Sequence, residues 1–148
     1  MIKEYKKQDF IGLLDFITSN RNSDFYITEE NRRKYVNTSY DLTKLIKSSN
    51  IIYLNKENGK ILGVLLVWVS LGNNLKRKYI KVNAINKEVV KGLLTVLLWN
   101  KKSSYYVKIK KDSDYIKAFK EKGFIFKGNR GSEILLIKKM KSGEVKND

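Results

Sequence analysis

Residues 78–98 read KYIKVNAINKEVVKGLLTVLL, and this stretch decides the fold. Its first part alternates, with Ile80, Val82 and Ala84 on one side, which predicts a strand with one apolar face. Asn86 then caps a helix in which positions 89/90, 93/94 and 97/98 form one broad apolar stripe. A strand that runs directly into such a helix is typical of a sheet covered by helices.

A strongly apolar hairpin precedes this stretch. Ile51 to Leu54 predicts a strand, Asn58-Gly59 predicts a tight turn, and residues 61–70 predict a return strand that is apolar at nearly every position. A strand without a polar face is buried on both sides, so helices are expected on both faces of the sheet.

The N-terminal segment combines a short strand with helices. Residues 2–5 predict a first strand, and Asp9 is the expected cap of a helix that ends near Ser19-Asn20. Thr28 is the expected cap of a charged helix over residues 29–37, and Asp41 that of a shorter helix with Leu42 inward.

The C-terminal part supplies the remaining elements. Residues 105–111 predict a strand, Asp112 is the expected cap of a helix ending at Gly123, and residues 124–138 predict a closing hairpin. The element order predicts an α/β (α+β) fold with a mixed, mostly antiparallel sheet of about seven strands and helices on both faces. We expect a single domain over residues 1–140 and a flexible tail at 141–148.

Composition excludes several kinds of chemistry. The chain has no cysteine and no histidine, which removes disulfides, thiolate and imidazole metal sites, and Ser-His-Asp or Cys-His catalysis. No metal is expected. The most apolar stretches, 61–69 and 89–99, are far shorter than the roughly 20 residues of a membrane helix, and the first residues lack the apolar core of a signal peptide. We therefore expect a cytoplasmic protein without a membrane partner.

The formal net charge is +16, and most of the excess follows residue 74. Such charge suits a polyanionic partner, either nucleic acid or a phosphate-rich cofactor. It also matches a lysine-, asparagine- and isoleucine-rich composition, which AT-rich coding produces. Because lysine greatly outnumbers arginine, any contact with nucleic acid is expected to be non-specific.

Residues 112–124 read DSDYIKAFKEKGF, and Gly123 suits the left-handed position that ends a helix. Together with the element order, this segment resembles the GNAT (GCN5-related N-acyltransferase) superfamily, whose late signature is roughly N-x-x-A-x-x-L-Y-x-x-x-G-F. The resemblance implies a transfer of an acyl group, usually acetyl, from acetyl-CoA or another acyl-CoA to a small-molecule or peptide amine.

The cofactor motif of that superfamily, P-x-x-R/Q-x-x-G-x-G/A, aligns without gaps on residues 86–94. Val89 then stands at the Arg/Gln position, Gly92 at the first glycine and Leu94 at the second. The resemblance implies cofactor contacts from five residues of this strand and helix, which are Val82, Ala84, Lys91, Gly92 and Leu93. For Gly92 the alternative is a helix glycine that permits close packing, and for Lys91 an ordinary surface lysine.

The resemblance also implies an acid for the departing thiolate. Phe119 occupies the position of the usual tyrosine, and Tyr115 lies one turn earlier as the candidate acid or as a packed aromatic residue. Three functions stay open. The chain is an N-acyltransferase with an altered cofactor loop, a non-catalytic binding module of the same fold, or a basic nucleic-acid-binding protein that uses aromatics such as Tyr105, Tyr106 and Phe126.

Overall fold

The computed structural model describes residues 1–22, 24–72 and 75–140, and the predicted tail at 141–148 lies outside them. These residues build one seven-stranded sheet in which every neighbouring pair is antiparallel except β6 and β7. In spatial order the strands are β1 (Ile2–Glu4), β4 (Ser49–Glu57), β5 (Lys60–Gly72), β6 (Leu75–Ala84), β7 (Tyr105–Lys110), β9 (Glu133–Lys138) and β8 (Ile125–Arg130). The predicted mixed, mostly antiparallel sheet is confirmed.

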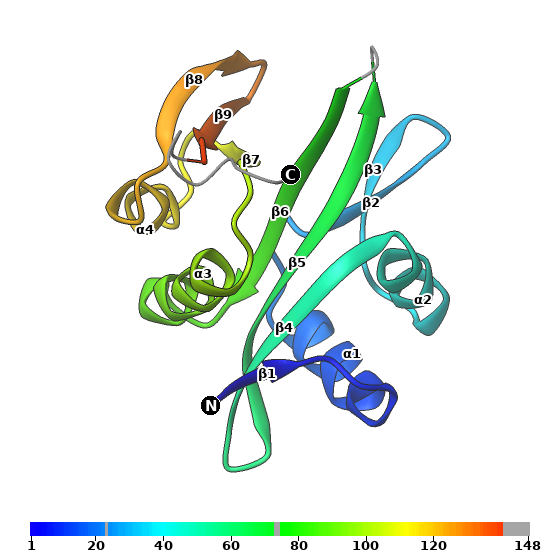
Figure 1. Ribbon diagram of the computed structural model, residues 1–148. Coiled ribbons are helices and arrows are strands. Elements are labelled where there is room, and N and C mark those ends of the chain that lie inside the picture. The colour runs from blue at the N-terminus through cyan, green and yellow to red at the C-terminus, as the bar shows by residue number, and fades with distance from the viewer. Residues whose placement is uncertain (23, 73–74, 141–148) are drawn as a thin grey trace.

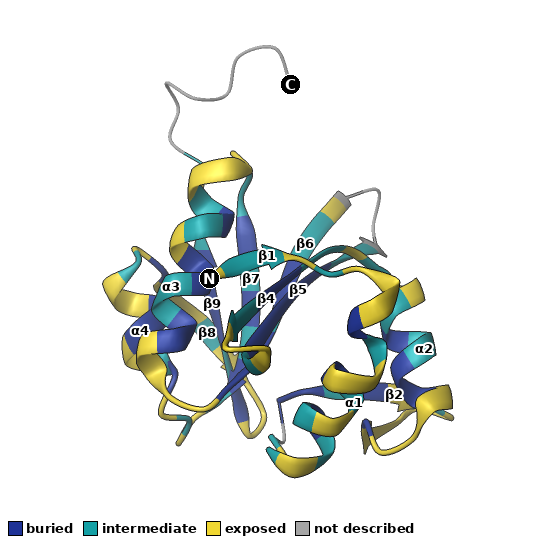
Figure 2. Ribbon diagram, turned by 90° about the horizontal axis from the view of Figure 1, so that it is seen from below, coloured by how far each residue is buried: buried dark blue, intermediate teal, exposed yellow. Residues whose placement is uncertain are grey.

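Helices cover both faces of this sheet (Figure 1). One face carries α1 (Phe10–Ser19), α2 (Ser39–Lys47) and a separate hairpin of β2 (Tyr26–Glu29) and β3 (Arg32–Tyr35). The other face carries α3 (Lys87–Asn100) and α4 (Ile116–Glu121). Seen from below, the buried strands β4 and β5 lie between the two pairs of helices (Figure 2).

Strand β5 is buried on both sides, as its sequence predicts. Leu65 and Val67 belong to the apolar cluster beneath α3, whereas Val64 and Leu66 belong to the cluster beneath α1 and α2. All four side chains are almost fully buried, and each contributes roughly 1.5–3 kcal/mol of burial energy. The preceding turn is also confirmed, because Asn58 and Gly59 both have positive φ, as a two-residue hairpin turn requires.

The predicted helix over residues 29–37 is wrong. These residues form most of the β2–β3 hairpin, in which Tyr26 faces Tyr35 across the two strands. Glu30 and Asn31 adopt positive φ values of 51° and 63° and make the two-residue turn. Ile27, buried in the core under α2, anchors the hairpin in place of an apolar helix stripe.

Two predicted caps also differ from the structure. Helix α2 is capped by Thr38, whose hydroxyl accepts from the Asp41 N–H, while the Asp41 carboxylate accepts from the Thr38 N–H. This is a capping box, so Asp41 closes the cap from inside the helix. Asp9 holds the predicted N-cap position of α1, but its side chain makes no cap bond to that helix. It ends a short 3₁₀ turn, η1 (Lys7–Asp9), and its carboxylate accepts from the Lys6 N–H at 2.9 Å.

On the other face, Asn86 caps α3 as predicted, since its side chain accepts from the Val89 N–H at 3.0 Å. Asp112 does not cap α4, which begins only at Ile116, and the Tyr115 N–H instead donates to the Ser113 hydroxyl. Gly123 has the predicted positive φ, 96°. No helix within the described parts of the chain is long and apolar enough to cross a membrane.

Candidate functional site

The centre of the sheet contains an interruption between β6 and β7. These two parallel strands share a single registered pair, Tyr79 with Tyr106, whereas β6 pairs with β5 along its whole length. Beyond Tyr79, the edge of β6 that faces β7 therefore has no continuous strand partner. Peptide groups at such an edge need another hydrogen-bonding partner.

Ala84, the last residue of β6, finds that partner in a side chain. The Tyr115 hydroxyl donates to the Ala84 carbonyl at 2.6 Å and accepts from the Ala84 N–H at 3.1 Å. Tyr115 is buried, and the Ala84 carbonyl also accepts from the Asn20 amide at 3.2 Å. A single hydroxyl thus stands where a paired strand or an extended ligand would supply one donor and one acceptor.

A surface pocket of about 740 Å³ opens beside this contact. It lies between the end of β6, the start of α3 and the start of α4. Three exposed lysines, Lys87, Lys117 and Lys120, line it together with one carboxylate, Asp114, and none of the three has an ion-pair partner within the described residues. Lys87 is the first residue of α3, where the positive end of the helix dipole adds to the charge of its side chain and favours an anionic ligand.

The opposite face of the interruption is polar and partly buried. Lys81 on β6 is half-buried, and burial lowers the pKa of its ammonium to about 8. Its Nζ lies 3.5 Å from the centre of the Tyr26 ring, so an aromatic face supplies a contact that water would otherwise make.

Two buried carboxylates lie near Lys81. Burial raises the pKa of Asp24, and the negative charge of Glu133 raises it further, although the Lys110 N–H donates to Asp24 Oδ1 at 3.2 Å. Glu133 pairs with Arg33 through Oε1, while its Oε2 is buried without a partner within the described residues. A raised pKa makes a carboxylate a stronger base than an ordinary one.

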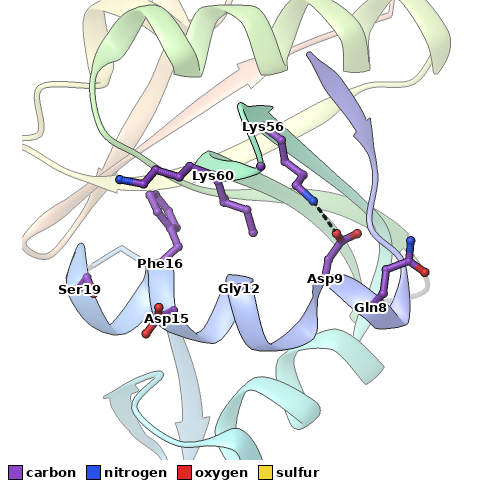
Figure 3. Close-up of a pocket in the computed structure, with 10 residues that line it drawn as sticks. Gln8, Asp9, Gly12, Asp15, Phe16, Ser19, Lys56 and Lys60 are labelled. Carbon is purple, nitrogen blue, oxygen red and sulfur yellow. Dashed lines mark hydrogen bonds and ion pairs between the residues drawn. The ribbon is translucent and has the colours of Figure 1, made fainter.

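A second pocket, of about 360 Å³, lies between α1 and the β4–β5 turn (Figure 3). Its buried carboxylate, Asp9, points at Lys56 with 3.0 Å between Oδ1 and Nζ, and Lys3 lies 3.1 Å from the other oxygen. Burial by itself raises the pKa of Asp9, but the Lys6 N–H and the two lysines hold that pKa below its ordinary value. These contacts supply hydrogen-bond partners to both oxygens of the carboxylate, so we assign Asp9 a structural role.

No protein-family model matches the sequence, and no curated protein matches it either. Several solved structures do match this chain. A GNAT-family acetyltransferase from Streptococcus pneumoniae superposes with a TM-score of 0.70 at 16% identity, covering 95% of this chain and 99% of that one. A ribosomal-protein-alanine N-acetyltransferase from Brucella melitensis gives a TM-score of 0.70 at 12% identity with the same coverage. AAC(6')-Ib in complex with ribostamycin and coenzyme A gives 0.69 at 15% identity, covering 100% of this chain and 97% of that chain.

The chain has the GNAT fold. The resemblance read from residues 80–98 and 112–124 is thus confirmed at the level of the fold. In the GNAT alignment, Val89 and Leu94 replace the Arg/Gln and the second glycine. Both side chains are buried in the core beneath α3.

The five residues predicted to contact the cofactor lie on β6 and α3, and their role in cofactor binding stays a prediction. Ala84 lines the pocket at the start of α3, while Val82 and Leu93 are buried in the core. Lys91 forms ion pairs with Glu88 and Glu121 at 3.0 and 3.4 Å. A side chain at Gly92 would meet Ile2 of β1 at 3.6 Å.

The GNAT position of the usual acid is apolar and closed here. Phe119 is fully buried, and its ring lies edge-on to Phe124 with 5.1 Å between the ring centres. Tyr115, the alternative acid, lies beside the sheet interruption, and its hydroxyl is engaged by Ala84.

The sequence did not point to Lys81, Asp24 and Glu133. In the sequence, Lys81 is one of three polar positions in the alternation of β6, with Tyr79 and Asn83, and nothing distinguishes it from them. Asp24 and Glu133 come from segments that only the folded chain brings together.

Proposed function

We propose that this protein is an acyl-CoA-dependent N-acyltransferase. The observation that carries the proposal is the end of β6 at Ala84, which has no partner in β7 and lies between a lysine-lined pocket on one side and a polar cluster with the buried Asp24 on the other. Its structural neighbours include several N-acetyltransferases, one of them solved with coenzyme A.

The residues present fit the cofactor. Lys87, Lys117 and Lys120, together with the first N–H groups of α3, would hold its phosphates. The Ala84 N–H and C=O already bind one hydroxyl as donor and acceptor, so they would pair equally with the two amide groups of the pantetheine arm. Tyr115 would have to release Ala84 for this to happen.

When bound, acyl-CoA would supply the acyl group, as the amine nitrogen bonds to the thioester carbonyl carbon, the C–S bond breaks toward sulfur and the nitrogen loses a proton. The chain's own residues would position the two partners, which by itself accounts for much of the rate enhancement in such reactions. Asp24 Oδ2, the oxygen that the Lys110 N–H leaves free, would accept the proton of the incoming ammonium. The acceptor would be a small-molecule or peptide amine, and the reaction would take place in the cytoplasm.

A second function is favoured by a different observation. The double hydrogen bond of Tyr115 to Ala84 closes the strand edge. Val89 and Phe119 lack the polar groups of the superfamily motifs, and Leu94 puts a side chain in place of the second glycine. A non-catalytic GNAT-fold binding module would keep this closed arrangement. Non-specific binding of nucleic acid rests on the net charge of +16 alone.

Calorimetric titration with acetyl-CoA separates the first two functions. We expect measurable binding and a thermal shift for the wild type, and an affinity at least tenfold lower for the triple variant Lys87→Gln, Lys117→Gln, Lys120→Gln. A matched variant with the same charge change, Lys7→Gln, Lys47→Gln, Lys60→Gln, removes three exposed lysines elsewhere and should bind as the wild type does. If millimolar acetyl-CoA gives neither heat nor a thermal shift, the acyltransferase proposal fails and the binding module is favoured.

A further inference from the structure

A pocket of about 500 Å³ lies on the sheet face opposite α3, beneath the β2–β3 hairpin and beside α2. None of its lining side chains is acidic, whereas Arg32, Arg33, Lys44, Lys81 and Lys108 all contribute cations. A concave site with one sign of charge concentrates ligands of the opposite charge. The lining therefore favours an anion over any other class of small ligand.

Only part of this positive charge is neutralised by the protein. Arg33 pairs with Glu133, and Lys44 pairs with Glu29 at 3.0 Å. Arg32, Lys81 and Lys108 have no carboxylate within 4 Å among the residues that the structure describes.

Two of these three cations, Lys81 and Lys108, lie against aromatic rings instead. Lys81 Nζ lies 3.5 Å from the centre of the Tyr26 ring and 5.6 Å from that of Trp68, and Lys108 Nζ lies 5.1 Å from that of Tyr79. The buried indole N–H of Trp68, which also lines the pocket, has no acceptor within the described residues. The pocket thus contains donors that lack acceptors, and a bound carboxylate or phosphate would supply them.

The environment of Lys81 agrees with this reading. Burial lowers the pKa of Lys81, the charges of Arg33 and Lys108 lower it further, and those of Glu133 and Asp24 oppose them. A bound anion would add a third opposing charge and raise the Lys81 pKa, so binding at pH 8 would take up protons.

The position of the pocket connects it with the proposed reaction. Lys81 follows Tyr79 by two residues on β6, and Lys108 follows Tyr106 by two on β7, so both lie just past the last registered pair of these strands. A ligand held by these two side chains lies at the interruption of the sheet. Ala84 and the lysine-lined pocket flank the same interruption.

We propose that this pocket binds the acidic group of a small amine bearing a carboxylate or a phosphate, and that this amine is the acyl acceptor. The second half of the statement rests on the proposed acyltransferase function. A polyamine or an aminoglycoside, which carries several amino groups, would meet like charges on Arg32, Lys81 and Lys108 and is disfavoured.

The first experiment needs no acyl-CoA. Inorganic phosphate and succinate are titrated into the protein at pH 8 in two buffers with different heats of ionisation, which reveals proton uptake. We expect binding with proton uptake in the wild type, and at least a fivefold loss of affinity in Arg32→Gln and in Lys108→Gln. The control Lys47→Gln removes an exposed lysine of α2 that does not line the pocket, and should leave binding unchanged.

The second experiment measures acetyl transfer to glutamate, phosphoethanolamine, ethanolamine and spermidine. We expect kcat/KM at least tenfold higher for one of the acidic amines than for ethanolamine, and a higher KM for that amine in Arg32→Gln. Preference for glutamate or for phosphoethanolamine identifies the acidic group as carboxylate or phosphate.

The outcomes separate the two proposals. Anion binding that depends on Arg32 and Lys108, without transfer to any amine, supports the anion site and contradicts the acyltransferase. Transfer that favours ethanolamine or spermidine overturns the acidic acceptor and leaves the acyltransferase standing. If neither phosphate nor succinate binds, the pocket assignment is overturned. It is also overturned if Arg32→Gln and Lys108→Gln weaken only the binding of oligonucleotides.

Discussion

The Tyr115 hydroxyl and the Ala84 peptide group hold each other through two hydrogen bonds, one at 2.6 Å and one at 3.1 Å. The contact joins the start of α4 to the last residue of β6, at the place where β6 no longer has β7 as a partner. Because the hydroxyl both donates and accepts, it takes the two bonds that the amide groups of an extended ligand would make to the same strand edge. Tyr115 therefore competes directly with any extended ligand that pairs with β6.

Tyr115→Phe tests this competition. The variant leaves the buried Ala84 N–H without its partner, so we expect a loss of about 1–3 kcal/mol in the free energy of unfolding, measured with denaturant. Acetyl-CoA should at the same time bind several-fold more tightly in calorimetric titration, because no hydroxyl has to be displaced.

Tyr105→Phe is the matched control for this prediction. The Tyr105 hydroxyl is also bonded to a main-chain carbonyl, that of Lys101 at 3.2 Å, but it makes no contact with Ala84. The control should lose stability without any gain in affinity for acetyl-CoA. A weaker affinity in Tyr115→Phe would show that Tyr115 assists the cofactor, and a selective loss of kcat would favour its role as the acid.

Gly63 on β5 and Gly92 on α3 should respond in opposite ways to substitution by alanine. A Cβ at Gly63 would lie 2.6 Å from Val89 Cγ1, so Gly63→Ala forces β5 and α3 apart and should cost about 1–3 kcal/mol. A Cβ at Gly92 would meet Ile2 at an ordinary 3.6 Å, and alanine favours the helix, so Gly92→Ala should stabilise by about 0.5–1 kcal/mol.

Gly92→Ala also tests the role of Gly92 in cofactor binding. If Gly92 serves only to pack α3 against β1, Gly92→Ala should leave the dissociation constant of acetyl-CoA unchanged. A clear loss of affinity in this variant, with stability retained, would instead assign Gly92 to the phosphate site that the superfamily motif implies.

The sequence predicted the elements whose signals are local. The alternation at Ile80 to Ala84, the Asn58-Gly59 turn and the cap at Asn86 each lie within a few residues, and the structure has all three. The β2–β3 hairpin was missed because its charged residues imitate a solvated helix. Its identity depends on the contact of Ile27 with the core.

The site could be predicted only in part for the same reason. Ala84 is a candidate from the sequence because it belongs to a strand-to-helix motif. Tyr115 lies 31 residues from Ala84, and Arg33 lies 100 residues from Glu133, so neither pairing leaves a trace in local spacing. The polar cluster around Lys81 arises from tertiary contacts, which periodicity cannot report.

Lys81→Met should stabilise the protein at neutral pH. The pKa of Lys81 is lowered from 10.5 to about 8, so at pH 7 the folded chain holds a charged ammonium that it disfavours, at a cost of up to about 3 kcal/mol. Between pH 8 and 10.5 the unfolded chain binds more protons at this position than the folded chain, and the wild type gains stability as pH rises.

The advantage of Lys81→Met should therefore be largest below pH 8 and shrink toward pH 10.5 in denaturant titrations. Lys47→Met, on the exposed surface of α2, serves as the control and should show no such pH-dependent difference from the wild type. An advantage that stays constant across this range would show that Lys81 is ordinarily solvated.

Asp24→Asn should separate the effect of a buried carboxylate on the stability of the fold from its role as a proton acceptor. The pKa of Asp24 is raised mainly by burial, so its ionised form destabilises the fold at neutral pH, and this penalty disappears as pH falls below the ordinary value of about 3.9. The amide oxygen of asparagine still accepts from the Lys110 N–H, so the variant should be at least as stable as the wild type at pH 7 and lose that advantage in acid.

If Asp24 accepts the proton of the acceptor ammonium, kcat should nevertheless fall about 100-fold or more, and the acidic limb of the pH–rate profile should vanish. Asp15→Asn, an exposed carboxylate on α1, should change neither quantity. Unaltered kcat in a stable Asp24→Asn variant would leave positioning of the two substrates as the source of the rate.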